Sequence, residues 1–152
     1  MMSGLWPKIS KAMDHTRTEN FSTLFELLPI GAYRTASDGC QTRANQAMVQ
    51  IFGFDTEAEM LAKLKSQHQG WYVDVSRRAE FRRLLETYGV VCQFVSEMRR
   101  DSGQTFWISE NAHAVRDSSG QLLYHEGTIE DVTARVEAEA ALVAAGADQR
   151  HP

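Results

Sequence analysis

The chain has 152 residues, of which 43% are hydrophobic and 24% charged, as expected for one globular domain with its own core. Its formal net charge is -4, and its basic residues occur in short pairs, so it offers no basic stripe for nucleic-acid phosphates. No apolar run reaches membrane-spanning length, and the first residues lack a signal-peptide core. We therefore expect a soluble, cytoplasmic domain that binds neither nucleic acid nor membrane.

Motifs for catalysis and metal binding are missing from the sequence. It contains no glycine-rich phosphate loop, metal triad, nucleophile elbow or paired-carboxylate helix. The two cysteines, Cys40 and Cys92, have no metal-binding spacing and are expected to be inert, reduced thiols. We therefore expect no metal site and no enzyme activity.

In chain order, the first element is a flanking segment, residues 1–20, which is either a short amphipathic helix or a frayed end. Asn20 is a suitable N-cap for a helical turn over residues 21–28, which Pro29 ends. Apolar side chains at helical spacing should pack this turn on the domain, namely Phe21, Leu24, Phe25 and Leu28.

A hairpin and three helices are predicted next. Ser37-Asp38-Gly39 is a turn sequence between two strand-like runs, residues 30–35 and 40–44. Three helices follow, over residues 46–52, 56–65 and 75–88. Residues that favour helix ends mark their limits, with N-caps at Asn45, Thr56 and Asp74 and stops at Gly53 and Gly89.

Three longer strands complete the domain, over residues 90–100, 105–116 and 122–132. The connections between them, Asp101-Ser102-Gly103 and residues 117–120, are hairpin turn sequences. Two strands, a run of helices and a three-stranded meander indicate an α+β fold. In such a fold the helices cover one face of an antiparallel sheet.

Five stretches of the chain, in this order, are LLPIGAYRTASDG, ANQAMVQIFGF, WYVDVSRRAEFRRLLETYG, MRRDSGQTFWI and GTIEDVTAR. In these stretches the chain resembles the PAS domain, a small sensor module of bacterial signalling proteins. The last stretch contains the closing Asp-x-Thr motif of the family, at Asp131 and Thr133. The resemblance covers residues 21 to about 135. It divides the chain into a flanking segment (1–20), a PAS sensor domain (21–133), and the start of a signalling helix with a tail (134–152).

The resemblance implies a five-stranded antiparallel sheet of strand order 2-1-5-4-3, with helices that cradle a ligand cavity and flanking helices at both ends. It also implies that the last helix couples sensing to an output partner, such as a kinase or cyclase in the same or another chain, commonly in a parallel homodimer. The expected function is sensory signal transduction, in which a small ligand or a protein partner is bound and its state is relayed through that helix.

Alternation with a period of two divides the long strands into a more apolar inner face and an outer face. The inner set is Cys92, Phe94, Ser96 and Met98, then Phe106, Ile108, Ala112 and Ala114, and finally Leu123, His125, Gly127 and Ile129. This phase also places Glu110 on the inner face. An unpaired carboxylate there is costly, so Glu110 should be paired, neutralised or in contact with a cavity.

Pairing of Arg116 with Gln121 across the second turn sets a register for these strands. Glu110 then lies opposite Gly127 and diagonal to His125. One hypothesis is therefore a polar cluster inside the cavity, formed by Ser96, Glu110 and His125. The alternative is that Glu110 lies at a bulge or a mobile edge and reaches water.

Aromatic and apolar side chains near the inner face extend the candidate cavity for a small organic ligand. The full set of candidates is Phe52, Trp71, Tyr72, Phe81, Phe94, Ser96, Met98, Ile108, Glu110, His125 and Ile129. Core packing is the alternative explanation for the aromatic residues, and it is the better one for Phe52 and Phe81.

The sequence leaves the cofactor unknown, but two kinds are not expected. Haem-binding PAS proteins carry their histidine on the long helix, and residues 76–88 contain none. Covalent flavin photochemistry needs a reactive cysteine where this chain has Gln69-Gly70-Trp71-Tyr72. Non-covalent flavin stays open. His125 is interpreted as a hydrogen-bonded strand residue and His68 as a surface residue rather than as ligands.

The junction between the last strand and the final helix is the candidate relay. Thr133 is expected to N-cap the helix, and Asp131 to add favourable charge near its start. Trp107 lies on the outer face, where the amino-terminal helix or a second subunit should cover it. Dimerisation is also favoured by a thin apolar seam at Val132, Val136, Ala140 and Val143.

Two other functions stay open from the sequence alone. The domain is a ligand-free dimerisation scaffold if its core is filled. It is a small cone-shaped α+β enzyme if Ser96, Glu110 and His125 form a catalytic group, but such groups are recognised by geometry and not by sequence.

Overall fold

The computed structural model describes residues 22–66 and 70–148. The predictions for the flanking segment 1–20, for Asn20, Phe21 and His68, and for the tail after 148 lie outside the described residues. In the part of the chain that is described, no helix is long and apolar enough to cross a membrane.

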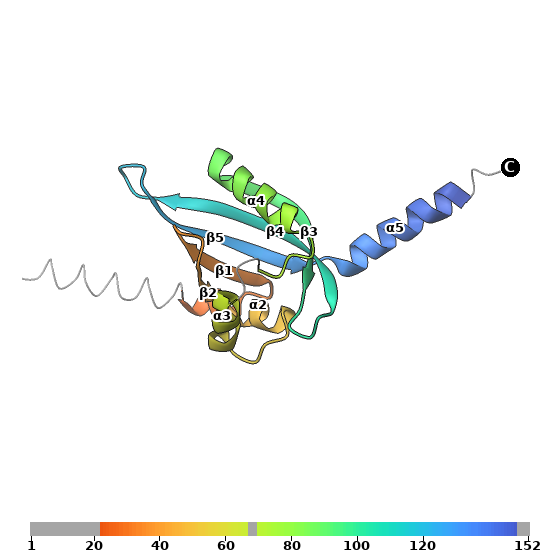
Figure 1. The fold of residues 1–152 in the computed structure, drawn as a ribbon, viewed down its shortest axis with the longest axis horizontal. Helices are drawn as coiled ribbons and strands as arrows, with labels where there is room; N and C mark the ends of the chain where they lie inside the picture. The colour runs from red at the N-terminus through yellow and green to blue at the C-terminus, as the bar shows by residue number, and fades with distance from the viewer. Residues whose placement is uncertain (1–21, 67–69, 149–152) are drawn as a thin grey trace, which may run out of the picture.

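A five-stranded antiparallel sheet of order β2-β1-β5-β4-β3 forms the centre of the domain, which confirms the predicted topology. The strands are β1 (Gly31–Ala36), β2 (Gln41–Ala44), β3 (Val90–Arg99), β4 (Thr105–Arg116) and β5 (Leu122–Asp131). Because β1 pairs with β5, the first hairpin and the last strand lie side by side in the sheet (Figure 1). Side chains from the first and the last strand of the domain thereby reach one inner face.

Besides the helical residues 22–27, the described part of the chain contains the helices α2 (Gln46–Ile51), α3 (Glu57–Ser66), α4 (Val75–Tyr88) and α5 (Thr133–Asp148). The first three cover one face, with α2 on β1, α3 on β2 and α4 on β3. The helix α5 extends away from the domain (Figure 1). Gly89 ends α4 in the left-handed conformation, with a φ of 72°, as its position after the last apolar residue predicts.

Asn45 caps α2, as the sequence predicts, and it also ties three elements together. Its side-chain oxygen accepts from the N–H groups of Met48, at 3.0 Å, and Ala32, at 2.8 Å. Its amide nitrogen donates to the carbonyl oxygens of Phe25, at 2.9 Å, and Ile30, at 3.0 Å. All four hydrogen-bonding positions of this fully buried side chain are therefore used.

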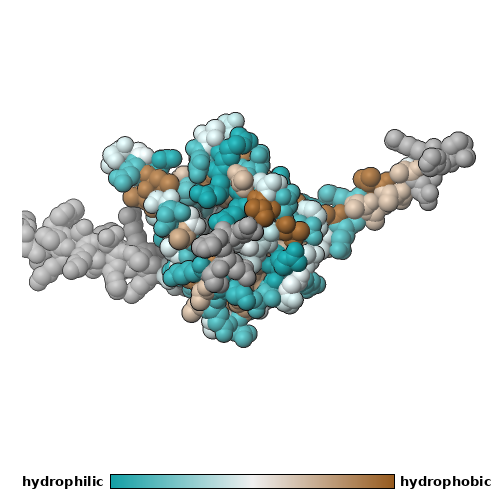
Figure 2. Space-filling view, in the orientation of Figure 1, coloured by the Kyte–Doolittle hydropathy of each residue, from teal (hydrophilic) through white to brown (hydrophobic). Residues whose placement is uncertain are grey.

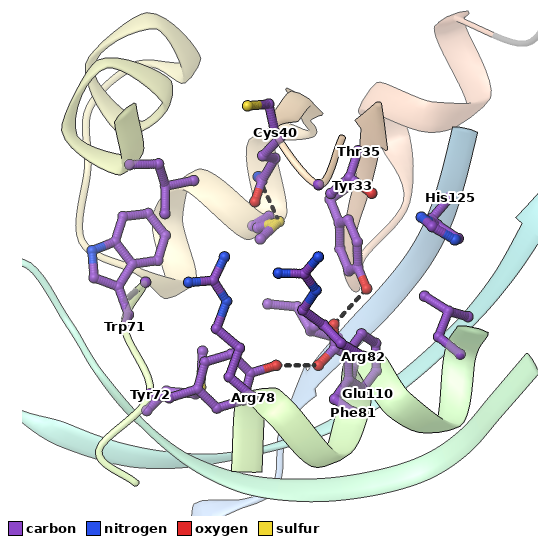
Figure 3. A pocket seen from close by; sticks show the side chains of 18 of the residues that line it. Tyr33, Thr35, Cys40, Trp71, Tyr72, Arg78, Phe81, Arg82, Glu110 and His125 are labelled. Carbon is purple, nitrogen blue, oxygen red and sulfur yellow. Dashed lines mark hydrogen bonds between the residues drawn. The ribbon is translucent and has the colours of Figure 1, made fainter. Parts of the chain in front are cut away.

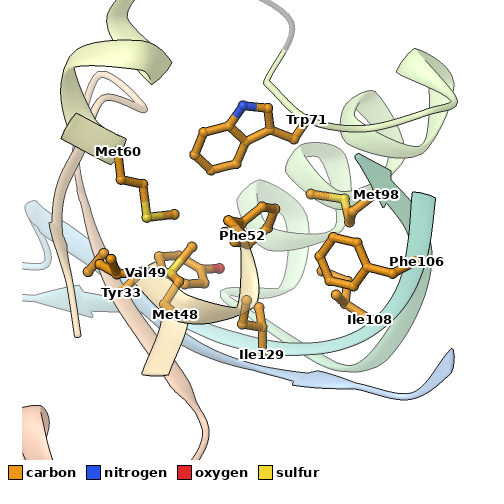
Figure 4. Close-up of a cluster of buried hydrophobic side chains, with 11 residues drawn as sticks. Tyr33, Met48, Val49, Phe52, Met60, Trp71, Met98, Phe106, Ile108 and Ile129 are labelled. Carbon is orange, nitrogen blue, oxygen red and sulfur yellow. The ribbon is translucent and has the colours of Figure 1, made fainter. Parts of the chain in front are cut away.

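The buried apolar side chains form two separate clusters. The larger one lies beneath α2 and α3 (Figure 4) and consists of Tyr33, Ala44, Met48, Val49, Phe52, Met60, Trp71, Met98, Phe106, Ile108 and Ile129. The smaller one lies beneath α4 and consists of Phe81, Leu85, Val91, Phe94 and Ala112. Two clusters instead of one continuous core leave room for a cavity between them.

The predictions for the start of β3 and for the early helical turn are wrong. Cys92 is exposed and Val91 is buried, because the β3–β4 register shifts between Val91 and Phe94. Within this bulge Gln93 has a φ of 49°, and the extra residue reverses the inward alternation. Within the described residues the early helical turn covers 22–27 and leaves out Leu28, and Leu24 is 62% exposed instead of packed on the domain.

Candidate functional site

A pocket of about 430 Å³ lies between the two hydrophobic clusters (Figure 3). Many of the predicted cavity residues line it, namely Phe52, Trp71, Tyr72, Phe81, Met98, Ile108, Glu110, His125 and Ile129. Its volume is in the range of natural small-molecule sites. Whether these residues bind a ligand stays a prediction.

Two of the predicted cavity residues are buried elsewhere. The Phe94 ring packs edge-on against Phe81 at a centroid distance of 5.5 Å. The Arg77 guanidinium lies over the Phe94 ring, 3.9 Å from the ring centre. Ser96 is 1% exposed, and its hydroxyl oxygen has no hydrogen-bond partner among the described residues. Both side chains are buried and do not line the pocket.

Glu110 lies at the inner end of the pocket and is held by two tyrosines. It is 6% exposed. The Tyr33 hydroxyl donates to its Oε1 atom, and the Tyr72 hydroxyl donates to Oε2 at 3.1 Å (Figure 3). These tyrosines come from β1 and from the segment before α4, whereas Glu110 is on β4. Three distant parts of the chain thus meet at one carboxyl group.

The predicted cluster of Ser96, Glu110 and His125 does not form. Arg116 pairs with Leu122 instead of Gln121, and an irregularity between Val115 and Arg116 shifts the register. Glu110 consequently lies opposite Ile129, while His125 lies opposite Ala114 near the other end of β4. Glu110 and His125 share a face of the sheet and line the same pocket, but the partners of Glu110 are tyrosines.

Burial dominates the protonation behaviour of this group. It raises the pKa of Glu110 to about 7, although the two tyrosine hydrogen bonds favour the ionised form. Burial, reinforced by Glu110, raises the pKa of Tyr33 and Tyr72 well above the usual range. Both phenols therefore remain hydrogen-bond donors, whereas Glu110 changes charge near neutral pH.

His125 lies farther out in the pocket and is half-buried. Burial, together with the nearby Arg116, lowers its pKa. Its imidazole is therefore mainly neutral at pH 7. It is a weak candidate for a counter-charge to Glu110.

Charged side chains surround the mouth of the pocket, which the sequence reasoning did not anticipate. They are Asp38, Lys65, Arg78, Arg82 and Glu86. Arg78 and Arg82 are one helical turn apart on α4 and share its face with Phe81 and Leu85, which also line the pocket. The spacing of Arg78, Phe81, Arg82 and Leu85 is the signal in the sequence that indicates this mixed face.

The junction between β5 and α5 is tied to the hairpin between β3 and β4. Arg100 donates to Asp131 Oδ2 at 3.0 Å. Asp131 Oδ1 accepts from the Thr133 amide at 3.0 Å and from its hydroxyl at 2.6 Å. Burial acts to raise the pKa of Asp131, but the bonds from Thr133 and Arg100 together hold it below its usual value. Asp131 is thus ionised at neutral pH.

A family model for the PAS domain matches residues 30–134, which contain both the pocket and this junction. The chain belongs to the PAS domain family. PAS domains are sensory signalling modules. Comparison with curated protein sequences finds no match.

Solved PAS structures share the fold. An RNA-binding light-oxygen-voltage receptor has a TM-score of 0.67 and 22% identity, over 97% of this chain and 40% of its own. A sensory box histidine kinase/response regulator from Burkholderia thailandensis has a TM-score of 0.64 and 20% identity, over 86% and 97% of the two chains. A PAS domain from a two-component sensor histidine kinase has a TM-score of 0.63 and 12% identity, over 78% and 98%. The chain spans less than half the length of the first of these proteins.

Thr133 has a different role in this PAS domain from the one predicted. It is the first residue of α5, and its hydroxyl accepts from the backbone N–H of Trp107 at 3.0 Å. The Trp107 carbonyl oxygen in turn accepts from Val132 N–H at 2.8 Å. Thr133 therefore fixes the start of α5 to β4, while Asp131 accepts the N–H at the helix start. Trp107 is half-buried, and its predicted dimer contact stays a prediction.

Two residues of the candidate site, Tyr33 and Arg100, were missed from the sequence. Tyr33 lies on the inner face of β1, a strand too short for its alternation to indicate which face is buried. Arg100 belongs to one of the short basic pairs of the sequence, Arg99-Arg100, and such isolated pairs are usually solvated. Its guanidinium instead donates to the Ile51 carbonyl oxygen and lies 3.9 Å from the Phe106 ring centre, besides binding Asp131. Proximity of these groups appears only in the folded chain.

We expect Arg100→Ala to lower the free energy of unfolding by about 2 kcal/mol, because it removes a partly buried ion pair and a bond to the end of α2. Chemical denaturation monitored by circular dichroism measures this change. Arg99→Ala is the matched control, since Arg99 is the exposed neighbour on β3 and, among the described residues, its side chain donates one hydrogen bond, to the Gly103 carbonyl oxygen at 3.5 Å. Equal effects of the two substitutions would show that the bonds from Arg100 to Ile51 and Asp131 do not stabilise the domain.

Proposed function

We propose that this PAS domain binds a small organic ligand in the pocket between its two hydrophobic clusters and relays the occupancy of that pocket through α5. The observation that supports the proposal most is the buried Glu110 with its two tyrosine donors at the inner end of an otherwise largely apolar pocket. A buried ionisable group in a cavity is a costly arrangement, and such groups cluster at binding sites.

The relay is supported by one residue that both parts share. Phe52 lines the pocket and packs against Trp71 at a centroid distance of 4.5 Å. Its carbonyl oxygen accepts from Asp101 N–H at 3.1 Å, and the carbonyl oxygen of the preceding residue accepts from Arg100. A ligand that displaces Phe52 therefore acts on the hairpin whose Arg100 holds Asp131.

A population shift describes how such a contact becomes a signal. If the ligand binds more tightly when the Arg100–Asp131 contact is closed, it orders the start of α5. If it prefers the open state, it releases that helix. In both cases ligand binding changes the order of α5, because the shift depends only on the difference in ligand affinity between the closed and open states.

The proposal is tested on the freshly purified chain of 152 residues. Native mass spectrometry and the ultraviolet-visible spectrum report a retained ligand, and a thermal-shift screen of small molecules supplies others. Hydrogen exchange of residues 133–148 then measures the order of α5 with and without ligand. A ligand that fills the pocket without changing this exchange would contradict the relay, and a pocket that takes no molecule would contradict the sensor.

Replacing Asp131 and Thr133 together by alanine is expected to uncouple pocket occupancy from α5. Ligand affinity should stay within about twofold, because neither residue lines the pocket, but the ligand-dependent change in hydrogen exchange of α5 should be lost. The matched control is Asp117→Ala with Ser119→Ala. That pair makes the same bonds in the β4–β5 turn, with 2.9 Å to the Ser119 amide and 2.6 Å to its hydroxyl, and it should leave the coupling intact.

We also propose that the domain works in the cytoplasm as a homodimer joined to an output domain, such as a kinase or cyclase, in the same or another chain. Leu142 and Val143 on α5 are each 73% exposed, and Figure 2 shows apolar surface on the projecting helix. An alanine-rich helix of this length is marginal in isolation, so a partner helix would stabilise it. Analytical ultracentrifugation of the chain with and without residues 134–152 tests the dimer.

The same proposal holds that the domain binds its ligand without transforming it. The register places His125 opposite Ala114, four residues along β4 from Glu110, and the Ser96 hydroxyl forms no hydrogen bond among the described residues. The residues that first suggested a hydrolytic group are therefore not joined in one. Recovery of every bound ligand unchanged after long incubation is the expected result, and a product peak would contradict it.

A further inference from the structure

The carboxyl group at the inner end of the pocket has hydrogen-bond donors but no counter-charge. Among the described residues, no Lys, Arg or His forms an ion pair with Glu110, and its two oxygens meet only the tyrosine hydroxyls. Each carboxylate oxygen can accept a second hydrogen bond. The site therefore has unused acceptor capacity in a place that water reaches poorly.

The walls around this carboxyl group are aromatic and apolar. Tyr33 and Tyr72 flank it, and its neighbours along and across the strands are Ile108, Ala112, Phe94 and Ile129. Trp71 and Phe52 close the pocket on the side of the larger cluster. Rings of this kind attract a cation through their faces, and an anion beside an unpaired carboxylate is repelled.

We propose that the pocket takes a small aromatic or branched apolar molecule that carries a cationic nitrogen, such as a protonated amine or an amidinium, and that this nitrogen donates to Glu110. This inference rests on the proposed ligand-binding function and specifies the chemistry of the ligand. The nitrogen supplies the counter-charge that the protein itself does not. The apolar body fills the space between Phe52, Trp71 and the inner face of the sheet.

The charges at the mouth do not reverse this preference. The basic side chains Lys65, Arg78 and Arg82 face the same opening as the acidic Asp38 and Glu86, and Arg82 lies 3.9 Å from Glu86 in an ion pair. His125 is mainly neutral, because burial lowers its pKa. Arg82 and Glu86 are exposed, so water and salt weaken their field, whereas Glu110 is buried. Arg78 is half-buried and its charge acts on Tyr72, but among the described residues it forms no ion pair with Glu110.

Protonation of Glu110 competes with such a ligand. Its pKa of about 7 in the free domain means that a permanent cation must displace a proton from an increasing fraction of molecules as the pH falls. The affinity for a cation should therefore fall by roughly tenfold for each pH unit below that value. A neutral ligand should show no such decline. Tyr33 and Tyr72, with pKa values above the usual range, do not titrate in this interval.

Three molecules of nearly equal shape test the inference by isothermal titration calorimetry on the full chain: benzylamine, benzyl alcohol and benzoate. At pH 8 we expect benzylamine to bind roughly tenfold or more tightly than benzyl alcohol, and benzoate more weakly than both. At pH 6 the advantage of benzylamine should be about tenfold smaller. Equal binding of the amine and the alcohol, tighter binding of benzoate, or no binding of benzylamine would overturn the inference.

A pair of variants assigns the preference to one carboxyl group. Glu110→Gln keeps the shape and should abolish the advantage of benzylamine over benzyl alcohol. Glu86→Gln removes an exposed carboxylate from the rim of the same pocket and should leave that advantage within about twofold. If Glu86→Gln abolishes the preference and Glu110→Gln does not, the inference is wrong. The comparison of three ligands on the unchanged chain decides the matter even if Glu110→Gln does not fold.

Failure of this inference is distinguishable from failure of the proposed function. If the screen finds only neutral or anionic ligands, and these change the hydrogen exchange of residues 133–148, the sensor proposal stands and the cationic ligand is excluded. If benzylamine binds at Glu110 but α5 does not respond, the cationic site stands and the relay is excluded.

Discussion

Gly127→Ala is expected to lower the free energy of unfolding by about 3 kcal/mol, because there is no space for a methyl group at this position. A Cβ atom there would lie 2.6 Å from the Asn111 carbonyl oxygen and 2.7 Å from the Tyr33 hydroxyl oxygen. The first is backbone in the adjacent strand, and the second is held by its bond to Glu110. Neither can move without breaking an interaction, so the sheet register or the Tyr33–Glu110 contact must give way.

Urea denaturation at equilibrium measures this loss, and Gly146→Ala provides the comparison. Gly146 lies in α5, and a Cβ atom added to it would meet nothing within 4 Å. That substitution should leave the domain unchanged or stabilise α5 by up to about 1 kcal/mol, since alanine favours a helix more than glycine does. A Gly127→Ala variant as stable as the original chain would show that the sheet adjusts freely around Tyr33.

The stability of the domain is expected to fall by about 3 kcal/mol between pH 4.5 and pH 7 on account of Glu110 alone. Its pKa rises from the ordinary value of 4.5 to about 7 in the folded domain. Between these values the folded state keeps a proton that the unfolded state releases, so stability declines as the pH rises. Below the lower value both states are protonated, and above the upper value the folded state carries the full cost of a buried charge.

The contribution of Glu110 is isolated by the difference between two denaturation series. The pKa values of His125 and Asp131 are lowered by folding, so these groups oppose the trend of Glu110 as the pH falls. They remain in Glu110→Gln, and they cancel when its free energy of unfolding is subtracted from that of the original chain at each pH. The difference should change by about 3 kcal/mol across the interval. A flat difference would mean that Glu110 ionises as freely in the folded domain as in the unfolded chain.

These two predictions concern the same few atoms. Gly127 leaves the space into which the Tyr33 ring fits, and Tyr33 holds Glu110. Loss of that space should therefore change the pH dependence as well as the stability. Gly127 does not line the pocket, but it affects the pocket through the position of Tyr33.

Much of the fold was predictable because its signals are local. Asn45 and Asp74 accept from amides two or three residues ahead, and Gly89 ends its helix with a left-handed φ. Such features depend on a few consecutive residues, which is the range over which composition and spacing carry information. The strand order followed from the PAS resemblance and is confirmed.

The site was only partly predictable. Strand alternation correctly placed Glu110 on the inner face, and that burial is why it changes its pKa. Its partners could not be found in the same way, since Tyr33 is 77 residues away in the chain and Tyr72 is 38 away. One bulge at Gln93 and one irregularity at Arg116 were enough to displace Cys92 from the core and His125 from Glu110.

The sequence by itself determined that this chain forms a PAS-type α+β domain, which helices and strands it contains, and that a carboxyl group lies among apolar residues. Only the tertiary structure decided that two tyrosines hold this carboxyl group, that it lies in a pocket between two clusters, and that Arg100 contacts both the end of α2 and Asp131. The physical reason is that periodicity reports which face of an element is buried, whereas the partner across that face depends on register. A bulge of one residue changes register without leaving a recognisable pattern in the sequence.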